Sequence, residues 1–272
     1  PVAPVLVGSG LAVADDGFRW GAFVAALVGA LALQVAANFA NDVSDAKRGA
    51  DADRVGPPRM VTAGVITPKR MWVATWVAVA VAALAGVYLI ATAGWVVAVI
   101  GVTSIVAMLT YVGGPIPYGY RGLGEVFVLI FFGFVATVGT RYVHDRSAPA
   151  DAWWLAVVMG MLAAAILVAN NLRDLDTDAK VGKHTLAVML GRPGARRLYT
   201  TLVMGSFVVI AAGPIVGVTH PLTALACMLI GLSAPLIRTA RTETEAHALI
   251  PLLAGTARLQ LLVGIALAAA AA

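Results

Sequence analysis

One uncharged apolar stretch, residues 71–111, constrains this chain more than any other feature. It contains no Asp, Glu, Lys or Arg, and about 20 apolar residues are enough for a helix to cross the ~30 Å hydrocarbon layer of a bilayer. The stretch is therefore too long for one crossing, and Ala93-Gly94 marks a tight turn between two membrane helices. Hydrophobic residues make up 60% of the chain and charged residues 12%, so the sequence predicts a polytopic membrane protein and excludes a soluble domain.

The whole chain is predicted to form one all-α transmembrane domain, residues 1–272, with nine membrane helices. The predicted spans are Val2–Ala14, Trp20–Ala40, Met71–Thr92, Trp95–Tyr111, Leu123–Thr140, Trp153–Asn170, Leu198–Val218, Leu222–Ile237 and Ala248–Ala270. The first span is short for a bilayer, and we expect it to be truncated. His220-Pro221 is expected to form the turn between the seventh and eighth spans.

Lys and Arg residues are distributed unequally between the two sides that nine crossings define. Fifteen of the nineteen lie on one side, Arg19, Arg141 and Arg146 lie on the other, and Arg258 lies within the last span. Because cytoplasmic loops carry the excess of positive charge, that side is predicted to be cytoplasmic, in a multi-pass protein of the plasma membrane. Topology thus explains the net charge of +5 without a nucleic-acid partner. Residues 141–146, on the far side, are predicted to form a solvated loop.

Polar residues are concentrated where the second span ends. The segment 38–51, NFANDVSDAKRGAD, follows an uncharged apolar helix. Its residues Asn38, Asn41, Asp42 and Asp45 fall within an arc of about 100° if the helix continues through them. Two carboxylates ~4 Å apart repel each other by on the order of 4 kcal/mol at an effective dielectric of about 20. A bound divalent cation would remove this repulsion.

The spacing of this motif recurs 133 residues later, where another apolar helix ends. The two sets are Asn38, Asn41, Asp45 and Gly49, and Asn171, Asp174, Asp178 and Gly182. Asp176 falls on the opposite face and is predicted to lie outside the site. Because four helices separate the sets, their helices run in the same direction, and the motif loops near 38–70 and 171–197 can converge on one cytoplasmic cavity. Either set alone is typical of a solvated loop, whereas two in-phase copies favour a binding site.

Basic residues accompany the carboxylates in both loops. They are Arg54, Arg59, Arg173 and Lys183. Arg suits bidentate binding of phosphate and Lys acts as a point charge. Any one of these charges is explained equally well by membrane topology, but the set favours an anionic ligand. A diphosphate ester would be repelled by bare aspartates, so its binding here requires Mg²⁺ ions between them.

Three further residues near the predicted cytoplasmic boundary are candidates for substrate contact. Tyr111 and Tyr118 flank the Gly113-Gly114-Pro115 turn, where an aromatic belt and a contact with diphosphate or an aromatic ring are equal explanations. Glu125 lies one turn inside a span, where a carboxylate costs up to ~3 kcal/mol. We therefore expect Glu125 to face the cavity or a partner such as Arg121, and it is a candidate acid or base at the acceptor site.

Four segments together resemble the UbiA superfamily of intramembrane prenyltransferases. They are NFANDVSDAKRGAD, RVGPPRMV, YVGGPIPYGYRGLGEVFVLIFFG and NNLRDLDTDAKVGKHTLAVMLG. Within the superfamily they are most similar to the branch that acts on 1,4-dihydroxy-2-naphthoate in menaquinone biosynthesis. The resemblance implies nine helices around a central cavity capped by cytoplasmic loops. It also implies Mg²⁺-dependent transfer of a polyprenyl chain from polyprenyl diphosphate to this aromatic acid, with loss of carbon dioxide, giving a demethylmenaquinone.

The same resemblance implies roles for the motif residues. The catalytic residues that hold the metal–diphosphate unit would be Asp42, Asp45, Asp174 and Asp178, with Asn38 as a further metal ligand. Asn41 and Asn171 would orient or coordinate the substrate. Lys183 and Arg54 would contact diphosphate oxygens, with Arg59 and Arg173 as further candidates.

Other functions remain open from the sequence. A prenyltransferase of the same superfamily could use another aromatic acceptor, such as 4-hydroxybenzoate, with the same diphosphate half of the site. A cation-coupled transporter belongs to a different class, although transporter sites usually lie near mid-bilayer and both motifs lie at one face. A purely structural scaffold does not explain the repeated motif. The sequence does not indicate the oligomeric state.

Overall fold

Apolar helices packed side by side form most of the described structure, a computed structural model that covers residues 1–49, 55–114 and 117–272. Seven helical rods in this part are long and apolar enough to cross a membrane. They are α2 (Trp20–Arg48), α3 (Pro68–Ala93), Gly124–Asp145, α7 (Ala150–Arg173), α9 (Leu186–Ile215), Pro221–Thr242 and His247–Ala271. Two shorter apolar helices, α1 (Val2–Ala14) and α4 (Val96–Thr110), accompany them. The prediction of an all-α, multi-pass membrane protein is confirmed.

Three of the rods are composite, and two short elements lie outside them. The rod Gly124–Asp145 comprises α5 (Gly124–Val128), a π-helical stretch η2 (Leu129–Val135) and α6 (Ala136–Asp145). The rod Pro221–Thr242 joins the 3₁₀ helix η3 (Pro221–Leu232) to α10 (Ser233–Thr242), and the last joins η4 (His247–Leu249) to α11 (Ile250–Ala271). The short elements are the 3₁₀ turn η1 (Tyr118–Arg121) and α8 (Leu175–Lys180).

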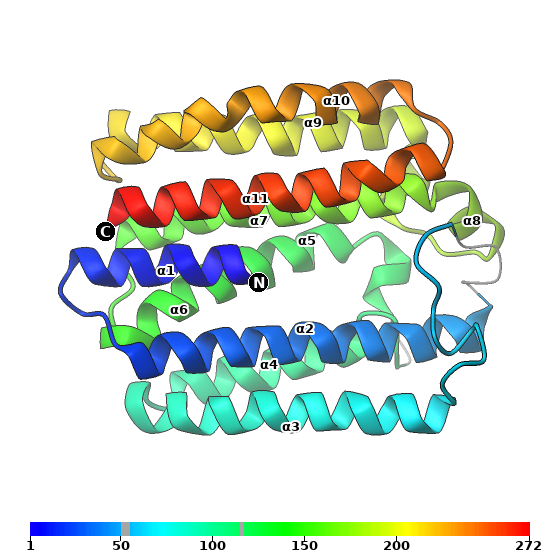
Figure 1. The fold of residues 1–272 in the computed structure, drawn as a ribbon, viewed down its shortest axis with the longest axis horizontal. Helices are drawn as coiled ribbons and strands as arrows, with labels where there is room; N and C mark the ends of the chain where they lie inside the picture. Colours follow the sequence, from blue (N-terminus) through cyan, green and yellow to red (C-terminus); the bar gives the residue numbers. More distant parts are fainter. Residues whose placement is uncertain (50–54, 115–116) are drawn as a thin grey trace.

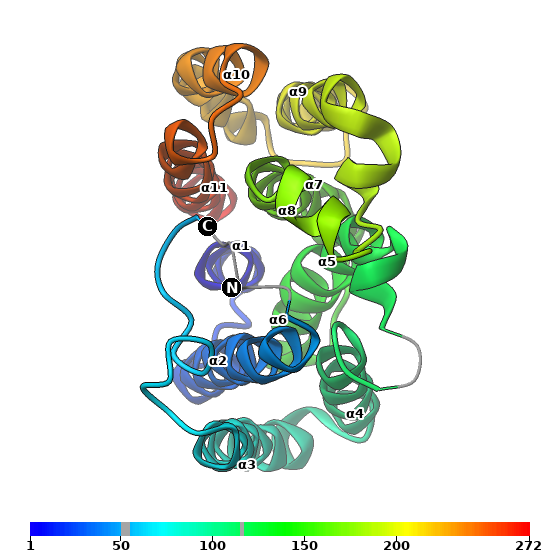
Figure 2. The same ribbon diagram turned by 90° about the vertical axis from the view of Figure 1, so that its right-hand side faces the viewer.

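Both motif-bearing helices finish at the same end of the bundle. In Figure 1, α2 and α7 run towards the side where α8 and the segment 55–67 lie, and Figure 2 looks onto this end. We call it the motif end. The two helices therefore point in the same direction, as the four-helix separation of the motifs predicts.

The predicted turns are found where the sequence places them. α3 ends at Ala93, Gly94 follows with a φ of 93°, and α4 begins at Val96. η3 begins at Pro221, and the side chain of His220 accepts a hydrogen bond from the amide of Leu222. Glycine tolerates this positive φ without strain, and proline suits the first turn of a helix, so both junctions follow from local chemistry.

α7 lies at the centre of the bundle, and two thirds of the residues in its most apolar 18-residue stretch are buried. It packs against α9, α11 and η2. A Cβ on Gly133 of η2 would lie 2.7 Å from the carbonyl oxygen of Ala156 on α7, so only glycine permits this approach. The close packing keeps α5 beside the end of α7. On the outside of the bundle, large apolar side chains such as Leu84 and Trp95 are exposed, as expected for surfaces that face lipid.

The predicted solvated loop at residues 141–146 is wrong for most of that segment. α6 continues to Asp145, and Arg141 and His144 are buried. The Arg141 guanidinium forms ion pairs with Asp145 and Asp15, each at 2.5 Å. A buried charge is tolerated when it is paired, and the pair with Asp15 joins the loop after α1 to α6. Helical spacing gives no sign of the partner Asp15, because it lies 126 residues away in the sequence.

Candidate active site

Both motifs begin on a helix and end at a left-handed glycine, but only the second is interrupted between these points. α2 continues without a break through Asn38 and Asp45 to Arg48, whereas α7 ends at Arg173 and α8 begins at Leu175. Gly49 ends the first motif with a φ of 69° and Gly182 ends the second with a φ of 70°. Both glycines adopt the left-handed conformation that commonly terminates helices, so the repeated spacing has a structural counterpart.

Asp42 is buried and faces the segment between α2 and α3. Its Oδ2 accepts a hydrogen bond from the amide of Met60 at 3.0 Å, and its Oδ1 accepts one from the amide of Val61 at 3.3 Å. Both carboxylate oxygens are therefore occupied by backbone donors. Asn38 lies one turn earlier on α2 and is exposed.

Tyr120 of η1 joins the first motif to the second. Its hydroxyl donates to Oδ1 of Asp45 at 2.8 Å, and its ring lies beneath the guanidinium of Arg48 at 4.7 Å from the ring centroid. The Lys183 ammonium lies 5.2 Å from the same centroid and 3.5 Å from Oδ1 of Asp178. The chain of contacts Asp45, Tyr120, Lys183, Asp178 therefore brings the two motifs together, as predicted.

Tyr120 was missed by the sequence analysis, which singled out its neighbours Tyr111 and Tyr118. Tyr120 is separated from Asp45 by 75 residues, and no periodicity relates a short 3₁₀ turn to a distant helix. The only available signal was its position beside Arg121 in the segment YGYRG, which resembles the family pattern.

Asp174 is held by the residues around it at the end of α7. The buried Arg173 guanidinium donates to both of its carboxylate oxygens, at 2.7 and 2.6 Å, and also to Oδ1 of Asn170 at 2.9 Å. Arg173 thus neutralises a motif carboxylate in this structure. Asp176 is exposed and pairs with Arg192 at 2.8 Å, on the outer side of α8, where the sequence places it outside the site.

The carboxylate of Asp178 lies where its ionised form is disfavoured. Burial raises its pKa to about 6, and the negative charges of Asp174 and Asp45 add to the shift while Lys183 opposes it. The contribution of Asp45 shows that carboxylates of both motifs lie within electrostatic range of each other. A cation placed among them would relieve both the repulsion and the loss of hydration.

Glu125 and Asn171 form a buried pair beside the motifs. The Asn171 amide donates to Oε1 of Glu125 at 3.0 Å, so the partner of this carboxylate is Asn171 and not Arg121. Tyr111 lies within electrostatic range of Glu125, Asp45 and Asp178. Tyr118 has a different place, because its hydroxyl donates to the carbonyl of Ala107 on α4 at 2.9 Å and its ring stacks on Phe127.

Three buried oxygen atoms around these residues find no hydrogen-bond partner within the part of the chain that the structure describes. They are Oδ1 of Asn41, Oδ2 of Asp178 and Oε2 of Glu125. Buried polar atoms are normally satisfied, so oxygens left open indicate a ligand or water. Hard cations such as Mg²⁺ take oxygen ligands, so the donor set fits Mg²⁺. Across residues 1–49, 55–114 and 117–272, however, no three His, Cys, Asp or Glu side chains form a ready-made metal cluster.

Two of the predicted basic residues remain to be placed. Arg59 lies in the segment 55–67 directly before the amides that Asp42 binds. Arg54 lies outside the described residues. The segment passes close to the second motif at Gly56, where a Cβ would lie 3.6 Å from Nη1 of Arg173.

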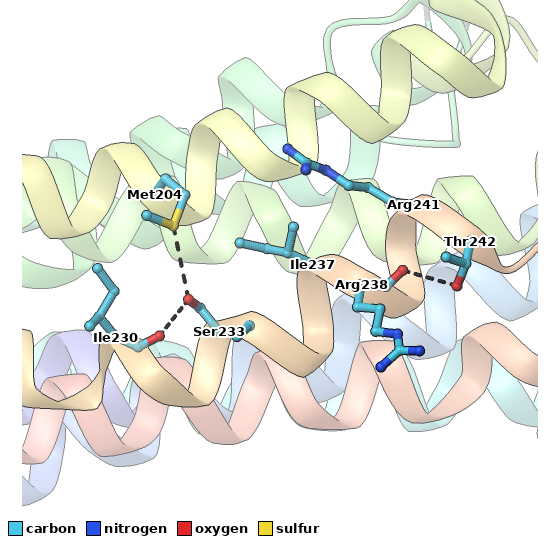
Figure 3. A pocket seen from close by; sticks show the side chains of 8 residues that line it. Met204, Ile230, Ser233, Ile237, Arg238, Arg241 and Thr242 are labelled. Carbon is cyan, nitrogen blue, oxygen red and sulfur yellow. Dashed lines mark hydrogen bonds between the residues drawn. The ribbon is translucent and has the colours of Figure 1, made fainter.

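One recess in the described structure lies away from the motifs. It has a volume of about 510 Å³ and lies between α9 and the η3–α10 rod. Figure 3 shows Met204, Ile230 and Ile237 on its apolar wall, with Arg238 and Arg241 towards the end of α10. Ser233 at its centre hydrogen-bonds to the carbonyl of its own helix neighbour Ile230 and contacts the sulfur of Met204.

Comparison with known proteins identifies the class to which this site belongs. The model of the UbiA prenyltransferase family matches residues 2–257. A solved UbiA homologue from Aeropyrum pernix K1 superposes with a TM-score of 0.67 at 15% identity, covering 97% of this chain and 96% of that one. The chain belongs to the UbiA prenyltransferase family, and it is therefore a prenyltransferase and not a transporter.

Two relatives of known activity are more similar to this chain in sequence. The 1,4-dihydroxy-2-naphthoate octaprenyltransferase of Mycobacterium tuberculosis is 40% identical over 278 residues, which cover 100% of this chain and 92% of that protein. The enzyme of the same name from Escherichia coli is 40% identical over 216 residues, covering 77% of this chain and 70% of that protein.

Proposed function

We propose that this protein transfers a polyprenyl chain from polyprenyl diphosphate to 1,4-dihydroxy-2-naphthoate, giving the quinol form of demethylmenaquinone. The observation that carries the proposal is the 40% identity to the Mycobacterium tuberculosis octaprenyltransferase over the whole chain. The predicted site residues support it, because Asp45 and Asp178 are joined through Tyr120 and Lys183 at one end of the bundle.

The diphosphate half of the site would be built from both motifs. Asn41, Asp45, Asp174 and Asp178 would hold Mg²⁺, with Asn38 as a further ligand. Mg²⁺, when bound, would link these oxygens to the diphosphate and neutralise the charge of the leaving group. Lys183 would reach a diphosphate oxygen from its place beside Asp178. Arg173, Arg59 and Arg54 would supply further positive charge around the diphosphate.

The acceptor half would lie beside Glu125, Asn171 and Tyr111. Asn171 holds one oxygen of Glu125 and leaves Oε2 open. This oxygen would accept a hydrogen bond, and then a proton, from a hydroxyl group of the naphthoate. Deprotonation makes the ring more electron-rich where it attacks the allylic carbon.

The reaction balances with these parts alone. The allylic C–O bond breaks and diphosphate leaves with the bonding electrons. The ring carbon that bears the carboxylate forms the new C–C bond. The carboxylate then departs as carbon dioxide, returning its electron pair to the ring, and the proton held by Glu125 returns to the ring oxygen. Apolar walls around the site would keep water from the allylic cation.

The same proposal includes orientation and crossings. α1 and α4 would complete nine crossings around a central cavity with the seven longer rods. The motif end would face the cytoplasm, since fifteen of the nineteen Lys and Arg residues lie on that side of a nine-span topology.

A product analysis tests the function. Purified protein in nanodiscs receives Mg²⁺, a polyprenyl diphosphate and, in parallel, 1,4-dihydroxy-2-naphthoate or 4-hydroxybenzoate, and products are identified by mass. The proposal predicts a prenylated naphthoquinol that has lost carbon dioxide, and no product with Asp178→Asn. Prenylated hydroxybenzoate as the main product would overturn the assignment of the acceptor.

A further inference from the structure

One carboxylate of the first motif is bonded unlike the others. Asp42 is 5% exposed, and each of its oxygens accepts a backbone amide, from Met60 at 3.0 Å and Val61 at 3.3 Å. Asn41 beside it and Asp178 opposite it each keep a buried oxygen without a partner in the described residues. The oxygens of Asp42 are therefore committed to the protein backbone, whereas these two are open to a ligand.

The segment that Asp42 holds is a compact turn. The amide of Ala63 donates to the carbonyl of Arg59 at 2.8 Å, and the amides of Val65 and Ile66 donate to the carbonyl of Met60 at 3.0 and 3.1 Å. The first amides of such a turn have no acceptor within the turn itself, as at the start of a helix. Asp42 supplies that acceptor from α2, some 18 residues away in sequence.

The same segment also reaches the second motif. At Gly56 it passes beside Arg173, the residue whose guanidinium holds Asp174. Figure 1 shows residues 55–67 at the motif end, passing α2 on the way to the start of α3. Fastening the segment at Met60 and Val61 therefore holds a strap, residues 55–66, that bonds to Asp42 of the first motif and lies beside Arg173 of the second.

We propose that Asp42 is a positioning residue that fastens the segment 55–66 over the active site, and is not a ligand of the magnesium ions. This inference rests on the proposed function. Binding of a cation by Asp42 would strip the acceptor from two amides of the turn. Asp45, three residues later, has the role of metal ligand on this helix.

Hydrogen–deuterium exchange of the metal-free protein tests the fastening directly. Asp42→Asn keeps the shape of the side chain but replaces one acceptor oxygen by an NH₂ group. This group is a donor, so it cannot accept a hydrogen bond from a backbone amide. We expect it to raise the exchange rate of the peptide covering residues 60–66 by roughly tenfold or more. The control Asp45→Asn should leave that peptide unchanged. Unchanged exchange in Asp42→Asn would overturn the proposal.

The dependence on divalent cation separates positioning from ligation. Mn²⁺ binding, followed by electron paramagnetic resonance, should weaken by roughly tenfold or more in Asp45→Asn and by less than about twofold in Asp42→Asn. Asp42→Asn should instead raise the KM for polyprenyl diphosphate and increase its hydrolysis by water. Equal loss of Mn²⁺ affinity in both variants would overturn the proposal.

A second variant removes the donor in place of the acceptor. Val61→Pro eliminates one of the two amides and leaves the Asp42 carboxylate intact, at a position in the first turn where proline is tolerated. It should reproduce the increased exchange and the higher KM with normal Mn²⁺ binding. Normal exchange and normal KM in this variant would overturn the proposal. If the wild-type protein prenylates no acceptor, the proposed function fails, while exchange and Mn²⁺ binding still decide the role of Asp42.

Discussion

Replacement of Tyr120 by phenylalanine isolates the contact that joins the two motifs. The variant loses the hydroxyl that donates to Asp45 at 2.8 Å and keeps the ring beneath Arg48 and Lys183. A hydrogen bond to a charged group contributes about 1.5–3 kcal/mol, and each 1.4 kcal/mol is about tenfold in rate. We therefore expect kcat/KM for polyprenyl diphosphate to fall by roughly 10- to 100-fold.

Tyr120→Leu removes the ring as well. Two cation–π contacts of about 0.5–1 kcal/mol each would then be lost in addition, so kcat/KM should fall by roughly a further 5- to 30-fold. Lys183 would also lose the surface that keeps it beside Asp178. A graded series, wild type above phenylalanine above leucine, is the expected result.

The assay is initial-rate prenylation in nanodiscs at saturating Mg²⁺ and acceptor, with polyprenyl diphosphate varied. Tyr118→Phe is the matched control, because its hydroxyl bonds to the carbonyl of Ala107 on α4 and not to a motif residue. It should retain kcat/KM within about threefold of wild type. A Tyr120→Phe enzyme as active as the wild type would refute the proposed link between the motifs.

Three further outcomes follow from the same geometry. Glu125→Gln can still accept from Asn171 but cannot take a proton, so kcat should fall by roughly 100-fold or more with little change in the KM for polyprenyl diphosphate, measured by steady-state kinetics. The raised pKa of Asp178 means that the folded, metal-free protein binds its proton more tightly than the unfolded chain does, so this stabilisation is complete below about pH 4 and is lost as the pH rises through about 6. The melting temperature of the metal-free protein should therefore fall between pH 4 and 7 by differential scanning fluorimetry, and Asp178→Asn should flatten this dependence. Arg141→Ala removes a buried guanidinium and its ion pairs with Asp145 and Asp15, whose side chains are partly exposed, and should lower the free energy of unfolding by about 1–3 kcal/mol, with unchanged kcat in the protein that remains folded.

Much of the architecture follows from the sequence because hydropathy and helix geometry are local properties. Seven of the nine predicted spans correspond to helices long enough to cross a membrane in the described residues, and the other two correspond to shorter apolar helices. The turns at Gly94 and Pro221 and the common direction of the two motif helices also match the structure. The repeated spacing also has a physical basis, since Gly49 and Gly182 end their motifs in the same left-handed conformation.

The site could be predicted only in part, because several roles depend on partners that are distant in sequence. Nothing local marks Asp42 as an acceptor for the amides of Met60 and Val61, or Tyr120 as the donor to Asp45. The same limit explains the burial of Arg141, whose charge is balanced by Asp15 in the loop after α1.

Arg173 binds a different partner in the structure from the one that the sequence suggests. The sequence suggests a contact with diphosphate, whereas the structure places its guanidinium on both oxygens of Asp174. A positively charged side chain in that position satisfies the carboxylate that Mg²⁺ would otherwise balance. Binding of the metal–diphosphate unit would therefore be expected to change the partners of Arg173.

The central claim is that Asp45 and Asp178, from two separate helices, hold one metal–diphosphate unit. A double-mutant cycle tests it, with Mn²⁺ binding measured by electron paramagnetic resonance in the presence of an unreactive polyprenyl diphosphate analogue. A shared unit predicts strong coupling, so that Asp45→Asn combined with Asp178→Asn binds Mn²⁺ little more weakly than the worse single variant. Losses of binding free energy that simply add would contradict the account.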